Sequence, residues 1–298
     1  MSGVVLRDAT PADAPAIVDF LNDHAREVYG EAEFAVEEIR HWFTMPDLVF
    51  AVAESDGRIV GYLDVSHENE MRRWDIDARG LDAAIADLLV AEGEARARAQ
   101  AAPGAVLRGF ASPKDPTAGA LARAGLEPIR SSFQMRIELA REIARPEWPE
   151  GVVVRAFRPG EDERVYEAHQ ESFEDHWDYR RTPMDEWRRW LRETPRFDPE
   201  LWFVAEEGDE IAGVALCAWH WSGDPQFGWV HVLGVRRPWR RRGLGLALLL
   251  HAFADFKARG ATRVGLGVDA ENTTGAVRLY ERAGMTVARR NDTYQKKL

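Results

Sequence analysis

The sequence predicts two α/β domains in tandem within its 298 residues. This length is about twice that of a typical domain. Three short segments of the first half recur in the same order in the second half, within alternating strand and helix patterns. The segments begin at Val4, Val49 and Leu121, and they recur at Val152, Trp202 and Tyr280. These repeats indicate a tandem duplication.

The predicted domain boundaries follow from the repeats and from a change in composition. A segment rich in proline and charge, residues 141–151, is expected to be the linker. The first domain is therefore predicted to span 1–140 and the second 152–298. Within each domain, one repeat is a hairpin pattern, with its turn at Asp56-Gly57 in the first and at Gly208-Asp209 in the second.

The composition is that of a soluble globular protein, with 45% apolar and 30% charged residues. The sequence has no apolar run of about 18 residues, as a membrane span requires, and its start lacks a signal-peptide pattern. We therefore expect a cytoplasmic protein with no membrane partner. The single cysteine, Cys217, excludes an intrachain disulfide and any multi-cysteine metal site. It lies in an apolar strand pattern and is expected to be a buried structural thiol, and no metal is expected.

A glycine turn between a strand and a helix is the strongest functional signal. An apolar strand pattern ends at Val235, and after a basic turn Gly243-Leu244-Gly245 precedes a helical pattern over 246–257. The turn contains five arginines, Arg236, Arg237, Arg240, Arg241 and Arg242. Unpaired N–H groups and the helix dipole favour an anion at such a point, and glycine permits close approach. The turn predicts a diphosphate site, although a solvated arginine cluster on an ordinary turn is the alternative.

Other phosphate motifs fit this turn less well. A Walker loop requires Lys-Ser or Lys-Thr after its glycines, and neither pair follows here. A dinucleotide fingerprint requires three spaced glycines after the first strand of its unit, whereas this turn lies deep within its domain.

Two motifs of the second half resemble those of the GNAT N-acetyltransferases. Arg240-x-x-Gly243-x-Gly245 resembles the R/Q-x-x-G-x-G/A signature of that family. The segment 272–285 resembles its N-x-x-A-x-x-L-Y-x-x-x-G-F block, with Met285 where Phe is usual. The resemblance covers 152–298, and the tandem layout is similar to that of the mycothiol synthase family, from which we infer architecture and not substrate.

The resemblance implies the fold and the reaction. Each domain is expected to be of the α/β (α+β) class, with a central, mixed, mostly antiparallel twisted sheet flanked by helices. The second domain is expected to transfer acetyl from acetyl-CoA to the primary amine of a small molecule or peptide, directly within a ternary complex. A GNAT-derived coenzyme A sensor or partner module with little turnover is the alternative.

The resemblance also implies a cofactor site along the strand, the turn and the second motif. Its predicted residues are Leu233, Gly234, Val235, Arg240, Arg241, Arg242, Gly243, Leu244, Gly245, Leu246 and Asn272. The strand part would pair with the pantetheine arm, and Gly234 would suit a bulge that aims an N–H at the thioester oxygen. The turn would hold the pyrophosphate. Asn272 would hydrogen-bond the pantetheine arm or an ordered water.

Two residues are predicted to move protons. Tyr280 lies within the second motif, and a phenol that is protonated at pH 7 can give its proton to a departing thiolate. The alternative is a packed aromatic on a stripe with Val277 and Met285. His231 resembles the histidine on this strand in serotonin N-acetyltransferases, and an imidazole suits accepting an amine proton at neutral pH. The alternative is a histidine satisfied inside the sheet.

The acceptor is expected near the first helical segment of the second domain and near one tryptophan of a later strand. The predicted acceptor residues are Glu174, Asp175, His176, Trp177 and Trp219. Carboxylates hold a cationic amine, and aromatic rings stack on a substrate or enclose an ammonium. A solvated acidic helix face is the alternative.

Charge and spacing predict that the first domain does not bind coenzyme A. Residues 1–150 have 16 Lys and Arg against 27 Asp and Glu, whereas residues 151–298 have 23 of each. The interval Gly61–Gly80 is shorter than its expected equivalent Gly213–Gly243, so the first domain is expected to lack a full cofactor strand and arginine turn. Asp82 is expected at the position that Gly245 has in the second domain, and a carboxylate repels a diphosphate. We expect no nucleic-acid partner for so acidic a chain.

Overall fold

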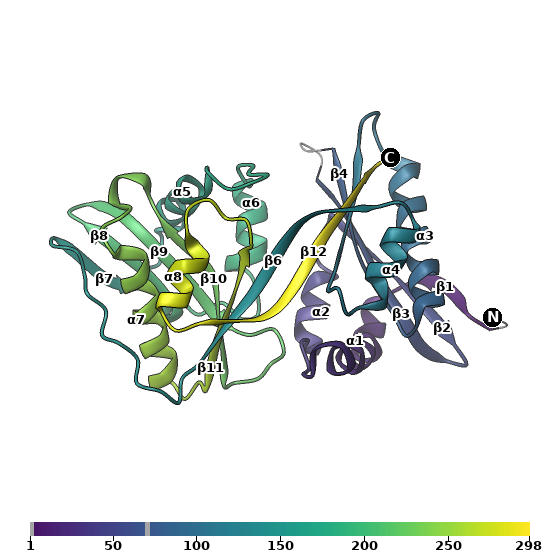
Figure 1. The fold of residues 1–298 in the computed structure, drawn as a ribbon, viewed down its shortest axis with the longest axis horizontal. Helices are drawn as coiled ribbons and strands as arrows, with labels where there is room; N and C mark the ends of the chain where they lie inside the picture. Colours follow the sequence, from purple (N-terminus) through teal and green to yellow (C-terminus); the bar gives the residue numbers. More distant parts are fainter. Residues whose placement is uncertain (1–2, 69–71) are drawn as a thin grey trace. The chain divides into compact units, whose positions relative to one another are not determined.

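The chain forms two compact units in the computed structural model, which describes residues 3–68 and 72–298 (Figure 1). Unit 1 comprises Met1–Ser132 with Arg289–Leu298, and unit 2 comprises Phe133–Ala288. Each unit is a mixed sheet flanked by helices, as predicted. Within the described ranges, every helix is too short or too polar to cross a membrane.

Unit 1 has the strand order β1-β2-β3-β4-β5-β12, with the first half of β6 beside β12. Its strands are β1 (Val5–Asp8), β2 (Leu48–Ser55), β3 (Arg58–Glu68), β4 (Arg73–Gly80), β5 (Val106–Ala111), β6 (Glu127–Glu138) and β12 (Thr286–Lys297). Its helices are α1 (Ala14–Tyr29), α2 (Val36–Trp42), α3 (Ala83–Gln100) and α4 (Pro116–Arg123). Helices α1 and α2 cover one sheet face, and α3 and α4 cover the other. The β4–β5 pair is parallel.

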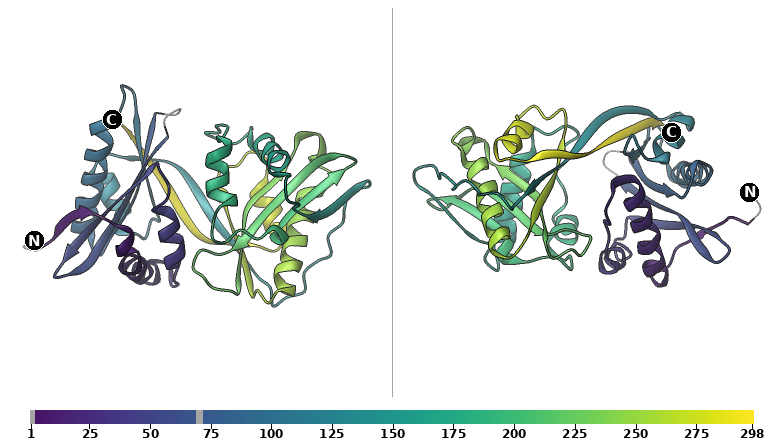
Figure 2. Two further views of the ribbon diagram at one scale, coloured as in Figure 1. Left: turned by 180° about the vertical axis from the view of Figure 1, so that it is seen from behind. Right: turned by 60° about the horizontal axis from the view of Figure 1, so that its bottom comes forward.

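Unit 2 repeats this arrangement in the order β6-β11-β10-β9-β8-β7. Its own strands are β7 (Val152–Ala156), β8 (Trp202–Glu207), β9 (Glu210–Trp219), β10 (Phe227–Val235) and β11 (Arg263–Asp269). Its helices are α5 (Asp162–Phe173), α6 (Met184–Trp187), α7 (Leu244–Ala258) and α8 (Ala276–Arg282). Helices α5 and α6 cover one face of the sheet, whereas α7 and α8 cover the other (Figure 2). The buried Cys217 packs on the α7 face, as expected of a structural thiol.

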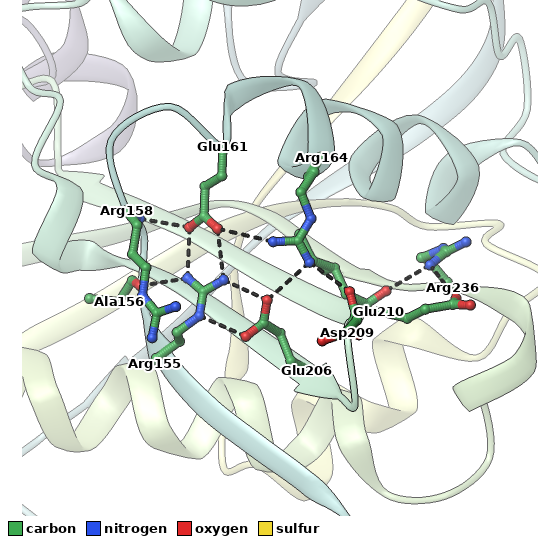
Figure 3. Close-up of polar contacts among 10 residues, drawn as sticks. Arg155, Ala156, Arg158, Glu161, Arg164, Glu206, Asp209, Glu210 and Arg236 are labelled. Carbon is green, nitrogen blue, oxygen red and sulfur yellow. Dashed lines mark hydrogen bonds and ion pairs between the residues drawn. The ribbon is translucent and has the colours of Figure 1, made fainter.

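An arginine clamp occupies the same place in both units. In unit 2, Arg155 of β7 forms ion pairs with Glu161 at 2.7 Å and with Glu206 of β8 at 2.5 Å (Figure 3). The corresponding residues of unit 1 are Arg7, Asp13 and Glu54, at 2.8 and 2.9 Å. In both units the strand register shifts beside this glutamate, because Val60 of β3 and Ala212 of β9 are extra residues. This shared detail supports a tandem duplication and explains why Arg7 and Arg155 each lie three residues after the start of the first repeat.

The last strand belongs mainly to the first unit. Strand β12 begins at Thr286 and pairs antiparallel with β5, from Asp292 opposite Ala111 to Lys297 opposite Val106. The chain passes from unit 1 into unit 2 within β6, and it returns from unit 2 to unit 1 within β12. The units therefore differ from the predicted ranges 1–140 and 152–298. Sequence repeats show that a terminal strand exists, but they do not show which sheet it joins.

Candidate active site

A β-bulge interrupts strand β10 at His231. The register pairs Val230 with Cys217 and then Val232 with Leu216, so His231 is the extra residue. The expectation of a bulge at Gly234 is wrong, because that residue pairs regularly with Val214. A glycine is required at position 234 for another reason, because α5 approaches the strand closely there. A Cβ atom at Gly234 would lie 2.9 Å from the Cβ atom of Ser172.

Strand β10 has an open backbone edge beyond the bulge. Its parallel register with β11 runs from Phe227 opposite Arg263 to Val230 opposite Leu266. The segment Val232–Val235 lies beyond that register but remains paired with β9 on its other side. An extended chain can pair with such an edge like an added strand. The predicted contact of Leu233–Val235 with a pantetheine arm is compatible with this geometry.

The glycine turn forms an anion cradle at the start of α7. The helix begins at Leu244, two residues earlier than expected, and Gly243 precedes it with φ 87° and no capping side chain. The N–H of Ala247 donates to the carbonyl of Gly243 at 3.0 Å, so the N–H groups of 244–246 precede the first helical hydrogen bond. A Cβ atom on Gly243 would meet nothing within 4 Å. Glycine is required there because of its left-handed conformation and not because of crowding.

The side chain of Arg240 stabilises this turn by binding to other residues of the chain. Its guanidinium donates to the carbonyl oxygens of Val235 and Ser172, both at 3.0 Å, and forms an ion pair with Asp175 at 2.6 Å. These contacts join the end of β10 to the end of α5. The side chain of the first residue of the predicted signature therefore has a structural role here.

Three further arginines of the turn are also paired with carboxylates. The pairs are Arg236 with Glu171 and Glu210, Arg237 with Asp175 and Glu174, and Arg242 with Glu207. The exposed Arg241 forms no ion pair within residues 3–68 and 72–298, and its φ is 64°. Four of the five predicted cations are therefore neutralised locally, whereas Arg241 and the helix N-terminus remain available to an anion.

The predicted acceptor residues do not converge on one place. Asp175 and Glu174 face the arginine turn, and Arg237 and Arg240 hold the pKa of the Asp175 carboxyl well below its usual range. His176 packs on Phe173, with ring centroids 4.3 Å apart, and burial lowers its pKa. The remaining two are tryptophans: Trp177 is exposed, and Trp219 packs on Phe256 of α7 at 5.4 Å. The two carboxylates therefore hold arginine instead of standing ready for an amine.

Tyr280 lies on α8 and is 8% exposed within the core that contains α7. Burial raises its pKa to about 12, so the phenol stays protonated at neutral pH. Its hydroxyl has no hydrogen-bond partner in the described part of the chain. The packing role and the capacity to donate a proton are both compatible with this position.

Asn272 shapes the loop before α8. Its side-chain oxygen accepts hydrogen bonds from the N–H of Thr274 at 2.8 Å and from the hydroxyl of the same residue at 2.5 Å. The oxygen is therefore engaged within the chain, and only the side-chain NH₂ group remains to donate to a ligand.

His231 is neutral at physiological pH. Burial lowers its pKa to about 4, below the range expected from the sequence. Its ring centroid lies 5.6 Å from that of Trp221, which follows β9, and the ring of Trp229 lies 6.2 Å from Trp221. Gly265 of β11 makes room for the ring of Trp229, because a Cβ atom there would lie 2.6 Å from it. The importance of Gly265 was not predicted from the sequence. The pattern Gly265-Leu266-Gly267 in an apolar strand could have indicated it, because alternating glycines leave one face of a strand without side chains.

Comparison with known proteins identifies the family. The model of the acetyltransferase (GNAT) family matches residues 163–285. The chain is 30% identical over 311 residues to a mycothiol acetyltransferase of Streptomyces bingchenggensis, covering 95% of this chain and 92% of the relative. It is 34% identical over 257 residues to a mycothiol acetyltransferase of Salinispora arenicola, covering 82% and 80% respectively.

Solved structures agree with this assignment. A GCN5-related N-acetyltransferase from Sphaerobacter thermophilus aligns with a TM-score of 0.80 and 31% identity, over 100% of this chain and 96% of that one. A tandem GNAT protein from the clavulanic acid biosynthesis pathway has a TM-score of 0.78 over 99% of this chain and 98% of its own. At 16% identity, that second likeness shows the fold alone. The chain belongs to the GNAT acetyltransferase family and is an acyltransferase, and members of this family use acetyl-CoA.

Proposed function

We propose that unit 2 binds acetyl-CoA and transfers its acetyl group directly to the primary amine of a small molecule or peptide in a ternary complex. One observation carries this proposal: the open edge of β10 leads into a helix N-terminus with unpaired N–H groups and a glycine cap. The residues fit the cofactor, since an extended arm and a diphosphate require these two features in this order. Acetyl-CoA would supply an activated thioester.

The cofactor would be held mainly by backbone. The edge residues Leu233–Val235 would pair with the pantetheine arm, and the N–H groups of 244–246 would bind the pyrophosphate. Arg241 would add the uncompensated positive charge of the turn. Asn272 would contribute its NH₂ group. Arg240 and Arg242 would act indirectly, because their side chains are already bound within the chain.

The chemistry requires one proton to leave the amine and one to reach the sulfur. The amine nitrogen forms the C–N bond with the acetyl carbon, the C–S bond breaks, and the products are an amide and a free thiol. Tyr280 would donate its proton to the thiolate and be reprotonated at the end of the cycle. The neutral imidazole of His231 would accept a hydrogen bond from the amine and pass its proton toward solvent.

The acceptor is proposed to be a small-molecule amine. The relatives from Streptomyces bingchenggensis and Salinispora arenicola are named mycothiol acetyltransferases. The form of mycothiol that lacks the acetyl group is therefore the first acceptor to test. Direct transfer is supported by Cys217, which is buried on the α7 face and has a raised pKa, so it is poorly suited to carry an acetyl group.

The test is thiol release by the full chain with acetyl-CoA and a panel of amines that includes the unacetylated mycothiol precursor. We expect stoichiometric thiol and amide, with initial-rate patterns that intersect, as in a ternary complex. Parallel patterns would contradict direct transfer. Tight binding of acetyl-CoA without thiol release for any amine would favour a sensor or partner module instead.

A further inference from the structure

The β8–β9 hairpin of unit 2 contacts the arginine turn through two carboxylates. We call Glu207 and Glu210 the hairpin carboxylates. Glu207, the last residue of β8, accepts the indole N–H of Trp239 at 2.8 Å and forms an ion pair with Arg242 at 2.7 Å. Glu210, the first residue of β9, forms an ion pair with Arg236 at 3.2 Å (Figure 3). The hairpin therefore holds the turn near both of its ends.

Unit 1 has the same hairpin with different residues at these two positions. The strand registers match, so that Ser55 stands opposite Arg58 in unit 1 as Glu207 stands opposite Glu210 in unit 2. The glutamate of the arginine clamp, one residue earlier, is present in both units. In unit 1 the strand β4 joins α3 through residues 81–82 alone, without an arginine turn. The clamp therefore accompanies the fold, whereas the hairpin carboxylates accompany the turn.

The segment between Trp239 and α7 has a strained backbone. Arg241 has φ 64°, in the left-handed region that residues other than glycine rarely adopt, and Gly243 has φ 87°. Such a conformation persists where the surrounding structure fixes the segment. Both ends of this segment are buried in one core, with Trp239 7% exposed and Leu244, the first residue of α7, 1% exposed. These two anchors therefore determine where the N–H groups of 244–246 point.

The two anchors differ in what their burial requires. Leu244 is apolar and needs no polar partner. Trp239 carries an indole N–H into the core, and a buried donor without an acceptor is costly. Glu207 supplies that acceptor. Its ion pair with Arg242 contributes less, because both side chains are 36% exposed and water screens their charges.

The charge of Glu207 opposes the binding of a diphosphate to the turn. Its hydrogen bond to Trp239 has the opposite effect, because it keeps the turn in one conformation. We infer that Glu207 is the positioning residue of the cofactor cradle, and that it acts through Trp239 to aim the N–H groups of 244–246 at the diphosphate. This inference rests on the proposed binding of acetyl-CoA by unit 2.

The first test compares two uncharged replacements of similar length. Glu207→Gln keeps an oxygen acceptor for the indole N–H, whereas Glu207→Met does not. In isothermal titration of the full chain, the Met variant should bind acetyl-CoA about fivefold to tenfold more weakly than the Gln variant. Glu210→Gln is the matched control and should stay within about twofold of the wild type, because Arg236 also binds Glu171 and the carbonyl of Ile211. Equal affinities of the Gln and Met variants would overturn the inference.

The second test removes the donor instead of the acceptor. Trp239→Phe leaves Glu207 charged and should weaken acetyl-CoA binding by about fivefold to tenfold. In the Trp239→Phe background, Gln and Met at position 207 should bind acetyl-CoA alike, because the N–H that distinguishes them is gone. A persistent difference between them would show that Glu207 does not act through Trp239.

A second ligand separates positioning of the cradle from a general structural role. S-acetylpantetheine has the arm and the thioester without the diphosphate. Its affinity, measured by competition with acetyl-CoA, should stay within about twofold of the wild type in the Met variant. An equal loss of affinity for both ligands would assign Glu207 a general structural role and overturn the inference.

This inference and the proposed function fail in different ways. If the wild type does not bind acetyl-CoA, the proposed cofactor site is refuted, and this inference with it. If the wild type binds but the Gln and Met variants bind equally well, the cofactor site stands and the positioning role is refuted. If the Met variant does not fold, Trp239→Phe decides alone, and an unchanged affinity for acetyl-CoA in that variant would overturn the inference.

Discussion

The two strand-to-helix turns of the molecule differ in what caps the following helix: a side chain in unit 1 and a glycine without a capping side chain in unit 2. In unit 2, residues 236–243 connect β10 to α7, and the helix begins behind a glycine. In unit 1 only Leu81 and Asp82 connect β4 to α3. The carboxylate of Asp82 accepts the N–H of Ile85 at 2.9 Å. In unit 1 the Asp82 carboxylate therefore lies at the helix N-terminus, whereas in unit 2 no side chain caps the N-terminus of α7.

The strands before these turns also differ in whether their backbone carbonyls are already bound by side chains of the chain. Strand β4 is complete, contrary to the expectation that the first copy lacks a cofactor strand, and it pairs with β3 without a bulge. Arg79 of β4 donates to the carbonyl oxygens of Ala78 at 3.2 Å and of Phe110 in β5 at 3.4 Å. Thr117 of α4 also donates to the carbonyl of Ala78, at 2.9 Å. Backbone acceptors that an extended ligand would use are thus satisfied by side chains.

The comparison also corrects two residue equivalences. Gly61 pairs with Gly80, and the corresponding Gly213 pairs with Val235, so Gly80 matches the end of the cofactor strand and not Gly243. Asp82 is the N-cap of α3 and therefore corresponds to Gly243, the N-cap of α7. The lost feature is the long turn with its bulged strand. We propose that unit 1 does not bind the cofactor because it satisfies its own polar groups, and not because it lacks a strand or a helix.

The largest expected effect comes from placing a carboxylate in the cradle of unit 2. Gly245→Asp should weaken acetyl-CoA binding at least about 100-fold in calorimetry, because the charge opposes the pyrophosphate. Gly245→Ala is the control for size. Its Cβ atom would lie 3.2 Å from the end of the flexible Leu279 side chain, so a loss within about fivefold is expected. Equal losses in both variants would point to crowding instead of charge.

The next effect concerns turnover. Tyr280→Phe should lower kcat about 100-fold and leave the affinity for acetyl-CoA nearly unchanged, since the ring still fills its place in the core. The measurements are steady-state rates and calorimetry on the same preparation. A parallel loss of affinity and turnover would assign Tyr280 a packing role alone.

A smaller effect on acetyl-CoA affinity should distinguish Arg241 from its neighbour Arg242. Arg241→Gln should raise the Kd for acetyl-CoA about fivefold to tenfold and reduce its dependence on salt, because this side chain has no competing ion pair among the described residues. Arg242→Gln should change the Kd less than about twofold, because that guanidinium is engaged by Glu207 at 2.7 Å. If both variants behave alike, the turn acts through its total charge.

The smallest effect is a pH-dependent stability in unit 1. Asp64 and Asp77 stand directly opposite each other in β3 and β4, and burial first, then the neighbouring carboxylate, raises the pKa of Asp64 to about 8. The folded state therefore binds more protons than the unfolded state between about pH 4 and pH 8, and stability falls as the pH rises through this range.

Asp64→Asn removes the charge and should raise the melting temperature by roughly 2–5 °C at pH 9, with little change at pH 5. Asp87→Asn, at an exposed ion pair with Arg123, is the matched control and should show no such dependence. An equal gain at both pH values would mean that the carboxylate is ionised throughout.

Local chemistry explains which features the sequence could predict. The glycine turn at the start of α7 and the strand that precedes it follow from neighbouring residues, and the structure contains both. The position of the bulge depends on how β9 and β10 align, and the pairing of Asp175 depends on the approach of α5 to the turn. Neither contact is local. The placement of β12 beside β5 is also beyond repeat patterns, since it joins residues about 187 positions apart.

The central claim is that one unit binds acetyl-CoA and the other cannot. Isothermal titration of the full chain with acetyl-CoA tests it most directly. The structure of the two turns predicts one site per chain in the wild type and none in Gly245→Asp over the same concentration range. Two equivalent sites in the wild type, or one undiminished site in the variant, would contradict the claim.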